Sequence, residues 1–280
     1  MSTRTVEAVI PAVRQLEGGG FEVRRPFPTA SVSQVDPFLL LDHMGPVDLG
    51  PGEAKGAPDH PHRGFETVTY MLDGTMEHED SAGHAGRIGP GDVQWMTAGA
   101  GVIHSEMPAE EIRRDGGRVH GFQVWVNLPA ADKMIEPRYQ EYPAAQIPEV
   151  HHDDGVVVRV IAGTVDEVSG AVQTRTPVTY LHVTLPAGTK FDASVPETQN
   201  AMVYGISGAG EGALEVFAHN GDTVTIANDD PSEPRQVLLL AGEPLREPVA
   251  RYGPFVMTTK AQIGEAIDDY QSGRFGVIAR

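Results

Sequence analysis

The chain contains no cysteine among its 280 residues. Disulfide bonds, thiolate nucleophiles, zinc–thiolate sites and cysteine-ligated iron–sulfur clusters are therefore excluded. Any metal site must use nitrogen and oxygen ligands, which histidine and carboxylate side chains supply. Long apolar runs are also missing, because no stretch approaches the roughly 20 residues that a membrane-spanning helix requires.

Basic residues are scarce relative to acidic ones. Lys and Arg total 21 against 39 Asp and Glu, which gives a formal net charge of −18 at pH 7. A surface of this charge repels phosphate backbones and anionic membranes. We therefore expect no direct nucleic-acid binding and no membrane docking, and the charge suits a protein partner better than DNA. The N-terminal residues lack the apolar core of a signal peptide, so the sequence predicts a cytoplasmic location.

The chain is punctuated by 32 Gly and 22 Pro residues that divide it into short segments. Between them lie runs rich in β-branched and aromatic residues, at Glu66–Leu72, Gly121–Asn127, Val156–Ile161, Thr179–Leu185, Leu214–Phe217 and Gln236–Leu240. Many short strands closed by turn residues predict an all-β fold of barrels or sandwiches. A proline-dotted, weakly periodic stretch between about residues 128 and 150 predicts a boundary between two domains.

One α-helix is predicted near the C-terminus. Thr259 and Gln262 have the spacing of a capping box, in which each side chain satisfies a free backbone N–H of the first turn. Apolar residues then recur on one helical face, at Ile263, Ala266, Ile267 and Tyr270. Gly273 is placed to end the helix.

Two pairs of residues have the spacing of a metal site. His60 and His62 flank Pro61, and on an extended chain side chains two residues apart project from the same face. His104 and Glu106 have the same spacing. If the two pairs lie on neighbouring strands, three imidazoles and one carboxylate converge on one point. This ligand set suits non-haem Fe(II), and also Mn, Co, Ni, Cu or Zn, so the residues leave the metal open.

The segments that carry these pairs, Asp59–Tyr70 and Pro90–Pro108, closely resemble the pirin family, which comprises two-barrel members of the cupin superfamily. The resemblance continues through His120–Leu128, Met134–Glu141, Ala241–Pro248, Tyr252–Met257 and Asp269–Gly276. It implies two β-barrel (bicupin) domains with a short C-terminal helix. We expect the first barrel, with the metal site, over residues 1–135, and a second, metal-free barrel over residues 136–280.

The same resemblance implies that His60, His62, His104 and Glu106 hold the metal, with Fe(II) favoured. Three features depart from the broader cupin pattern. That pattern takes its carboxylate from the first motif, where this chain has Glu66, whereas pirin-like sites use the second motif. Its usual proline is Thr97 here, and two extra residues precede His104. Glu66 therefore has two interpretations: an acceptor for the N–H of a ligating imidazole, or a strand residue that points outward.

The resemblance implies two alternative functions. Some pirin-like proteins oxidise flavonols such as quercetin with O₂, which opens the ring with loss of carbon monoxide. In that case the partners are an aromatic small molecule and O₂, and Glu106 is the catalytic residue that takes the phenolic proton. Pirins are also described as redox-sensitive, iron-binding regulatory proteins that bind a transcription factor or a metabolic enzyme without turnover. The sequence leaves both open.

Several other residues have a structural and a functional interpretation. His120 begins a strand and is expected in the core, and His84 is expected in a loop, whereas His78 stays open. Trp95 and Trp125 are large strand residues expected in the core, with a pocket wall for a flat aromatic ligand as the alternative.

Overall fold

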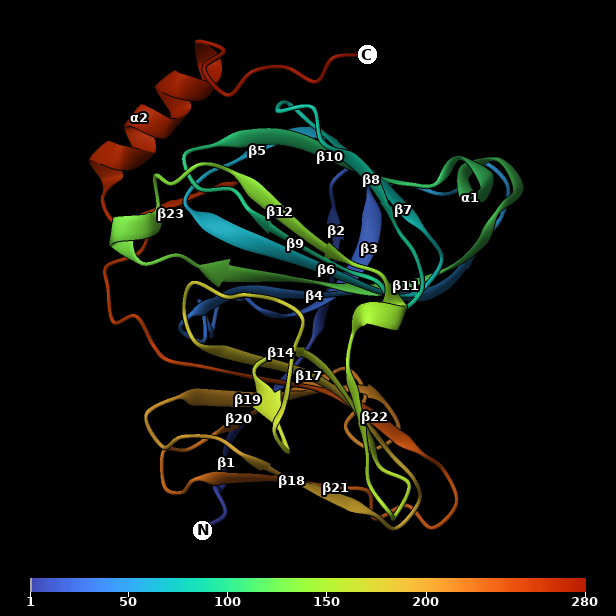
Figure 1. The fold of residues 1–280 in the computed structure, drawn as a ribbon. Helices are drawn as coiled ribbons and strands as arrows, with labels where there is room; N and C mark the ends of the chain where they lie inside the picture. The colour runs from blue at the N-terminus through green and yellow to red at the C-terminus, as the bar shows by residue number, and fades with distance from the viewer. Residues whose placement is uncertain (1) are drawn as a thin grey trace. The chain divides into compact units, whose positions relative to one another are not determined.

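The computed structural model describes residues 2–280. It divides into two compact units, each assembled from separate stretches of the chain. Unit 1 comprises the chain up to Val13, Thr29–Pro37 and Ala145–Leu245, and unit 2 comprises Arg14–Pro28, Phe38–Ala144 and Arg246–Arg280. Strands dominate both units (Figure 1), so the predicted all-β class is confirmed. No helix within residues 2–280 combines the length and apolarity that crossing a membrane takes.

Unit 2 is built mainly from two β-sheets. The strands of the larger sheet are β2 (Val13–Glu17), β3 (Phe21–Phe27), β4 (Phe38–Leu49), β6 (Phe65–Asp73), β9 (Val93–Thr97), β11 (Gly117–Asn127) and β12 (Arg138–Tyr142). Those of the smaller sheet are β5 (Ala57–His62), β7 (Met76–Asp80), β8 (Ala85–Ile88) and β10 (Val102–Pro108). Their orders are β12-β9-β6-β11-β4-β3-β2 and β5-β10-β7-β8. Figure 1 shows the smaller sheet lying across from the larger one.

Unit 1 is a second, more aliphatic β structure. Its strands are β1 (Val6–Pro11), β13 (Glu149–His151), β14 (Val157–Ala162), β15 (Thr164–Val165), β16 (Val168–Ser169), β17 (Val178–Leu185), β18 (Lys190–Ser194), β19 (Asn200–Ser207), β20 (Ala213–Phe217), β21 (Thr223–Ala227) and β22 (Arg235–Gly242). The main sheet has the order β1-β20-β19-β22-β17-β14-β13. Its core is a cluster of buried Val, Leu, Ile, Ala and Phe side chains, so apolar burial stabilises this unit. All six strand segments predicted above coincide with strands of the two units.

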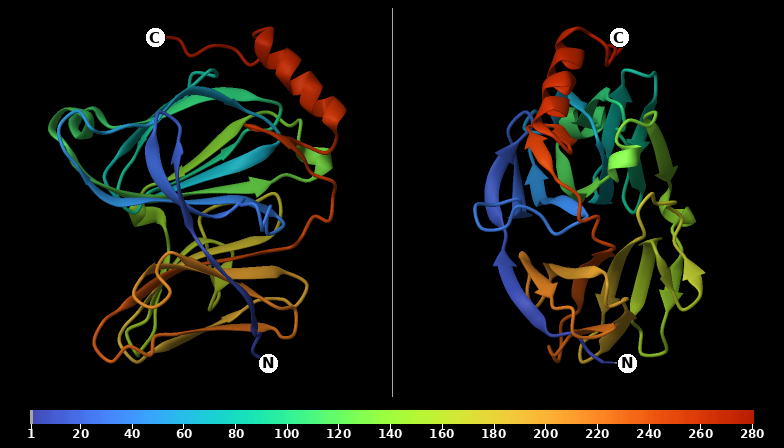
Figure 2. Two further views of the ribbon diagram at one scale, coloured as in Figure 1. Left: turned by 180° about the vertical axis from the view of Figure 1, so that it is seen from behind. Right: turned by 90° about the vertical axis from the view of Figure 1, so that its left-hand side faces the viewer.

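The units differ from the continuous segments 1–135 and 136–280 in several ways. Thr29–Pro37 belongs to unit 1, and the central boundary falls between Ala144 and Ala145. At the N-terminus, β1 pairs with β20, with Val9 opposite Glu215, and therefore belongs to unit 1. Figure 2 shows this blue strand beside the orange strands of unit 1. At the C-terminus, residues 246–280 return to unit 2. The pairing of β1 with β20 and the bridge between Arg63 and Phe255 each join segments about two hundred residues apart. Local sequence patterns carry no signal for such contacts.

The C-terminal segment adds a small hairpin and a helix to unit 2. The hairpin is formed by β23 (Ala250–Tyr252) and β24 (Phe255–Met257), and the helix is α2 (Lys260–Gln271). The predicted capping box is present, because Thr259 accepts from the backbone N–H of Gln262 and the Gln262 side chain accepts in return. Gly273 follows at φ +77°, a conformation that favours glycine.

The other α-helix within residues 2–280, α1 (Glu110–Asp115), was not predicted. Its six residues bury only Ile112, so it lacks the repeated apolar spacing that identifies longer helices.

Candidate metal centre

The two predicted ligand pairs lie on neighbouring antiparallel strands of the smaller sheet in unit 2. His60 and His62 are on β5, and His104 and Glu106 are on β10. His104 lies directly opposite His60, and a register shift follows, so that Glu106 is opposite Ala57. Because opposite residues and residues two apart share one face of a sheet, the four side chains point to the same side.

The three imidazoles form a compact cluster. Their ring centroids are 4.7 Å apart for His60 and His62, 4.4 Å for His60 and His104, and 4.9 Å for His62 and His104. One nitrogen of each ring lies within 4.8 Å of the other two. Small ring rotations would bring these nitrogens to bonding distances of roughly 2.0–2.2 Å from a single ion.

The hydrogen bonds of the rings leave lone pairs for a metal. The Nδ1–H of His60 donates to the carbonyl oxygen of Pro58 at 2.7 Å, which leaves Nε2 unprotonated. Neither nitrogen of His104, nor Nδ1 of His62, has a hydrogen-bond partner within residues 2–280, although all three atoms are buried. Buried nitrogens without partners are costly in an ordinary core, and ligation by a metal explains them.

Burial also keeps two of the three rings neutral, as metal ligation requires. It lowers the pKa of His104 to about 4 and that of His62 well below its ordinary value. Both imidazoles are thus neutral at pH 7, so a metal need not displace a bound proton from either ring. With a metal bound, the three imidazoles would be neutral and the carboxylate would carry one negative charge, which suits a divalent cation.

Glu106 is held beside the histidines by hydrogen bonds. Its Oε1 accepts from the hydroxyl of Thr69 at 2.9 Å, its Oε2 accepts from Nε2 of Gln123 at 2.8 Å, and Oε2 lies 4.0 Å from Nε2 of His104. Burial alone would raise the pKa of Glu106, but His104, His60 and these two hydrogen bonds together lower it. Glu106 is therefore an ionised carboxylate with a fixed orientation. Thr69 and Gln123 were not singled out from the sequence, although each is a polar residue between two apolar neighbours in a predicted strand.

A cavity of about 770 Å³ opens beside the cluster, and His60, His62 and Glu106 contribute to its wall. Apolar and charged side chains complete the lining, among them Phe21, Met76, Trp125, Arg25 and Arg251. Its size is that of a typical small-molecule site. Trp125 forms the wall next to the cluster, with its ring 5.3 Å from that of His62. Both interpretations of Trp125 hold, because it belongs to a buried core cluster and also lines the cavity, whereas Trp95 is buried core.

Comparison with known proteins identifies the family. Residues 20–126 match the family model described as Pirin, and residues 180–276 match the model of the Pirin C-terminal cupin domain. The chain belongs to the pirin family. Pirin of Homo sapiens is 42% identical over 287 residues, with 98% of this chain and 95% of that protein covered.

Solved structures agree with this family and fold. A quercetin 2,3-dioxygenase from Acinetobacter baumannii superposes with a TM-score of 0.92 at 36% identity, covering 99% of this chain and 100% of that one. A bacterial pirin from Escherichia coli, solved in complex with nickel(II), shares the fold with a TM-score of 0.66 at 20% identity, over 85% of this chain and 99% of that one. The predicted resemblance to pirins and the bicupin fold are therefore confirmed.

Two of the three departures of this pirin-family chain from the broader cupin pattern are paired in space. Glu66 and Thr97 are opposite each other on β6 and β9, and the Thr97 hydroxyl donates to Oε1 of Glu66 at 2.6 Å. Glu66 is an odd number of residues from Thr69, which contacts Glu106, so strand alternation directs it to the opposite face of the sheet. Glu66 is thus buried but turned away from the cluster. This geometry favours the interpretation of Glu66 as a strand residue that points away from the ligand cluster, although its side chain is not exposed to solvent.

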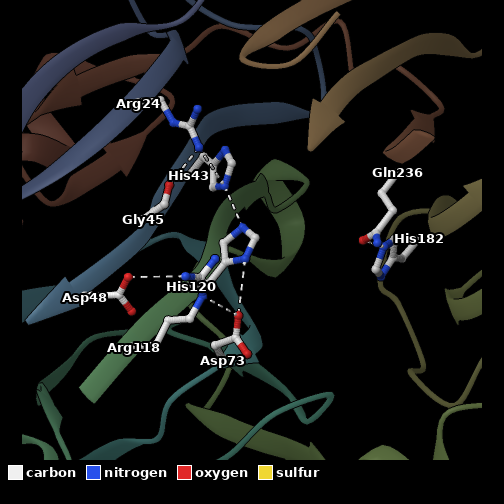
Figure 3. A network of polar contacts seen from close by, with 9 residues as sticks. All are labelled: Arg24, His43, Gly45, Asp48, Asp73, Arg118, His120, His182 and Gln236. Carbon is white, nitrogen blue, oxygen red and sulfur yellow. Dashed lines mark hydrogen bonds and ion pairs between the residues drawn. The ribbon is translucent and has the colours of Figure 1, made fainter. Parts of the chain in front are cut away.

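The remaining histidines of unit 2 have structural partners. His120 is buried, as predicted, and its Nε2 lies 2.8 Å from Nε2 of His43 (Figure 3). Nη2 of Arg24 lies 3.2 Å from the same His43 nitrogen. Because arginine only donates, His43 Nε2 is the acceptor and His120 the donor. His78, whose role the sequence left open, is buried, and its Nε2 lies 2.6 Å from Oε1 of Glu141. His84 lies in the predicted loop, which follows β7.

The histidines of unit 1 are scattered. His182 lies 3.2 Å from Oε1 of Gln236, on the side of β17 away from the aliphatic core (Figure 3). His219 lies 2.8 Å from Oδ1 of Asn200. The core of this unit is an apolar cluster, and the one convergent group of possible metal ligands found among the described residues, His60, His62 and His104, lies in unit 2.

Proposed function

We propose that the chain is a metal-dependent dioxygenase that oxidises a flavonol-type aromatic substrate, such as quercetin, with O₂. The observation that carries this proposal is the convergence of His60, His62 and His104 beside the ionised Glu106, at the wall of a cavity large enough for an aromatic molecule. Similarity over the full chain to a quercetin 2,3-dioxygenase supports the same class of reaction.

In this proposal His60, His62, His104 and Glu106 hold one metal ion in the first barrel, and the aliphatic interior of unit 1 supports a second barrel without metal. The ligand set and the family favour Fe(II), and Mn, Co, Ni, Cu or Zn can also bind to nitrogen and oxygen ligands. When bound, the metal would supply the Lewis acidity and electron exchange that O₂ chemistry on a flavonol requires.

The chain's own residues would bind the substrate and move its proton. Trp125 and the apolar lining exclude water and contact a flat ring. Glu106, ionised at neutral pH, is the base that takes the phenolic proton. Gln123 and Thr69 each donate a hydrogen bond to one of the Glu106 oxygens and so fix the orientation of this carboxylate in the cavity wall.

The test is anaerobic purification with metal analysis, followed by O₂ consumption with quercetin. It compares the wild type with His62→Ala and with His151→Ala, a control that removes an exposed histidine of unit 1. About one equivalent of metal, with quercetin-dependent O₂ uptake that His62→Ala abolishes and His151→Ala retains, is the expected result. Bound metal without uptake would reject the dioxygenase and favour the redox-regulated binding protein. No bound metal would reject the ligand assignment itself.

A further inference from the structure

Two arginines line the cavity beside the proposed metal site, and they differ in their partners. Arg25 is fully engaged: its Nε and Nη2 donate to the two oxygens of Asp42 at 2.6 and 2.5 Å, and Nη2 also lies 2.8 Å from Oε1 of Glu17. A guanidinium held by two carboxylates is neutralised where it stands. Arg25 therefore shapes the wall and has little capacity for a ligand.

Arg251 has no such carboxylate. Within residues 2–280 it makes no ion pair, and its one hydrogen bond runs from Nη1 to the carbonyl oxygen of Leu39 at 3.1 Å. Its guanidinium carbon instead lies 4.8 Å from the centroid of the Trp125 ring. A guanidinium that rests its face on an indole keeps its other N–H groups free in its own plane. Arg251 is exposed, and Asp42 and Glu17, which Arg25 already engages, attract it only from beyond ion-pair distance.

The position of Arg251 links it to the proposed catalytic base. Nε1 of Trp125 donates to Oε1 of Gln123 at 3.2 Å, and Nε2 of Gln123 donates to Oε2 of Glu106 at 2.8 Å. Arg251, Trp125, Gln123 and Glu106 thus form one connected wall of the cavity. Burial, followed by repulsion from Arg25, lowers the pKa of Arg251, and attraction by Asp42 and Glu17 opposes this only in part.

We propose that Arg251, seated on Trp125, binds an ionised acidic substituent of a planar aromatic substrate. This inference rests on the proposed function of the cavity. It restricts the expected substrates to planar aromatic molecules that carry an ionised acidic group. The substrate then carries a negative charge away from the group that approaches Glu106 and the histidines. Neutral aromatic molecules of the same shape bind more weakly, because they leave the guanidinium without a partner.

The experiment measures binding of a matched pair of probes by isothermal titration calorimetry on the metal-loaded protein. 2-Naphthalenesulfonate carries a charge and is a weak metal ligand, and 2-naphthalenesulfonamide is its neutral counterpart. The wild type is compared with Arg251→Gln, with Arg251→Lys, and with Arg114→Gln as a control that removes an exposed arginine of helix α1. Circular dichroism melts establish that each variant is folded.

The wild type and Arg114→Gln should prefer the sulfonate by about tenfold, the effect of one hydrogen-bonded ion pair. Arg251→Gln should lose this preference by weakening sulfonate binding alone, and Arg251→Lys should retain part of it. Equal binding of both probes to the wild type would overturn the inference. So would equal weakening of both probes in Arg251→Gln, because Arg251 would then only support the wall.

The inference and the proposed function can fail separately. Charge discrimination that depends on Arg251, in a protein that oxidises no flavonol, would support the anion site and reject the dioxygenase. Oxidation of quercetin without any charge discrimination would reject the anion site and support the dioxygenase.

Discussion

Lys133 is a deeply buried charged group bonded to the segment that follows His62, and replacing it by methionine tests how that segment is held. Its side chain is 1% exposed. Its ammonium donates to the carbonyl oxygen of Gly64 at 2.7 Å, to Oδ1 of Asn127 at 2.6 Å and to the carbonyl oxygen of Val256 at 3.0 Å. Burial lowers the pKa of Lys133 to about 8, so it remains an ammonium at pH 7 and supplies all three donors.

Methionine matches the length of lysine but donates nothing. Three buried oxygens would lose their partner, and each such loss costs roughly 1–3 kcal/mol. Relief from burying an ammonium offsets part of this sum, so we expect the free energy of unfolding to fall by about 3–5 kcal/mol. For a chain of this size the melting temperature should then drop by roughly 10 °C.

Calorimetric melting of Lys133→Met provides the measurement, with Lys55→Met as a control that removes an exposed lysine of the same unit. Because Gly64 lies two residues after His62, metal affinity measured by chelator competition should fall as well. A melting temperature for Lys133→Met within about 2 °C of the control, which corresponds to a change below about 1 kcal/mol, would refute the reasoning.

Three further experiments probe the candidate site, the buried histidine pair and the packing around a glycine of unit 1. Gln123→Leu removes the donor to Oε2 of Glu106, so metal affinity by chelator competition should fall about 10- to 100-fold, and unchanged affinity would contradict this role. Burial lowers the pKa of His43 to about 2 in the folded chain, whereas the unfolded chain takes up a proton below about pH 6.5. Unfolding free energy should therefore decline as pH falls from 6.5 to 4.5, by about 3 kcal/mol from this group, and His43→Gln should flatten the decline in urea titrations at each pH. Gly205→Ala would place a Cβ 2.1 Å from a backbone oxygen and should destabilise the chain by about 1–3 kcal/mol, whereas Gly264→Ala, which meets no atom within 4 Å, should raise stability slightly in the same urea assay.

Much of the fold could be predicted because its signals are local. The run Glu66–Leu72 alternates and is rich in β-branched residues, and it became β6 with one added residue at each end. The capping box at Thr259 and Gln262 needs only residues three apart, and it begins α2 as expected. Likewise, the i, i+2 spacing of the two ligand pairs required only that β5 and β10 be neighbours.

What the sequence could not reveal depends on long-range pairing. The membership of β1 in unit 1 follows from its pairing with β20, which no local pattern encodes. Gln123 and Arg251 acquire their meaning from contacts with Glu106 and Trp125, which only the folded chain brings together. The face to which Glu66 points depended on its distance along the strand from Thr69, whose contact with Glu106 was unknown beforehand.

The central claim, a single metal site on three histidines and Glu106, is tested most directly by counting bound metal. The protein would be loaded anaerobically with Fe(II), passed through a desalting column and analysed by mass spectrometry of the elements, as wild type, as His104→Ala and as the His151→Ala control. The account predicts about one iron per chain in the wild type and the control, and nearly none in His104→Ala. Retention of a full equivalent by His104→Ala would contradict it.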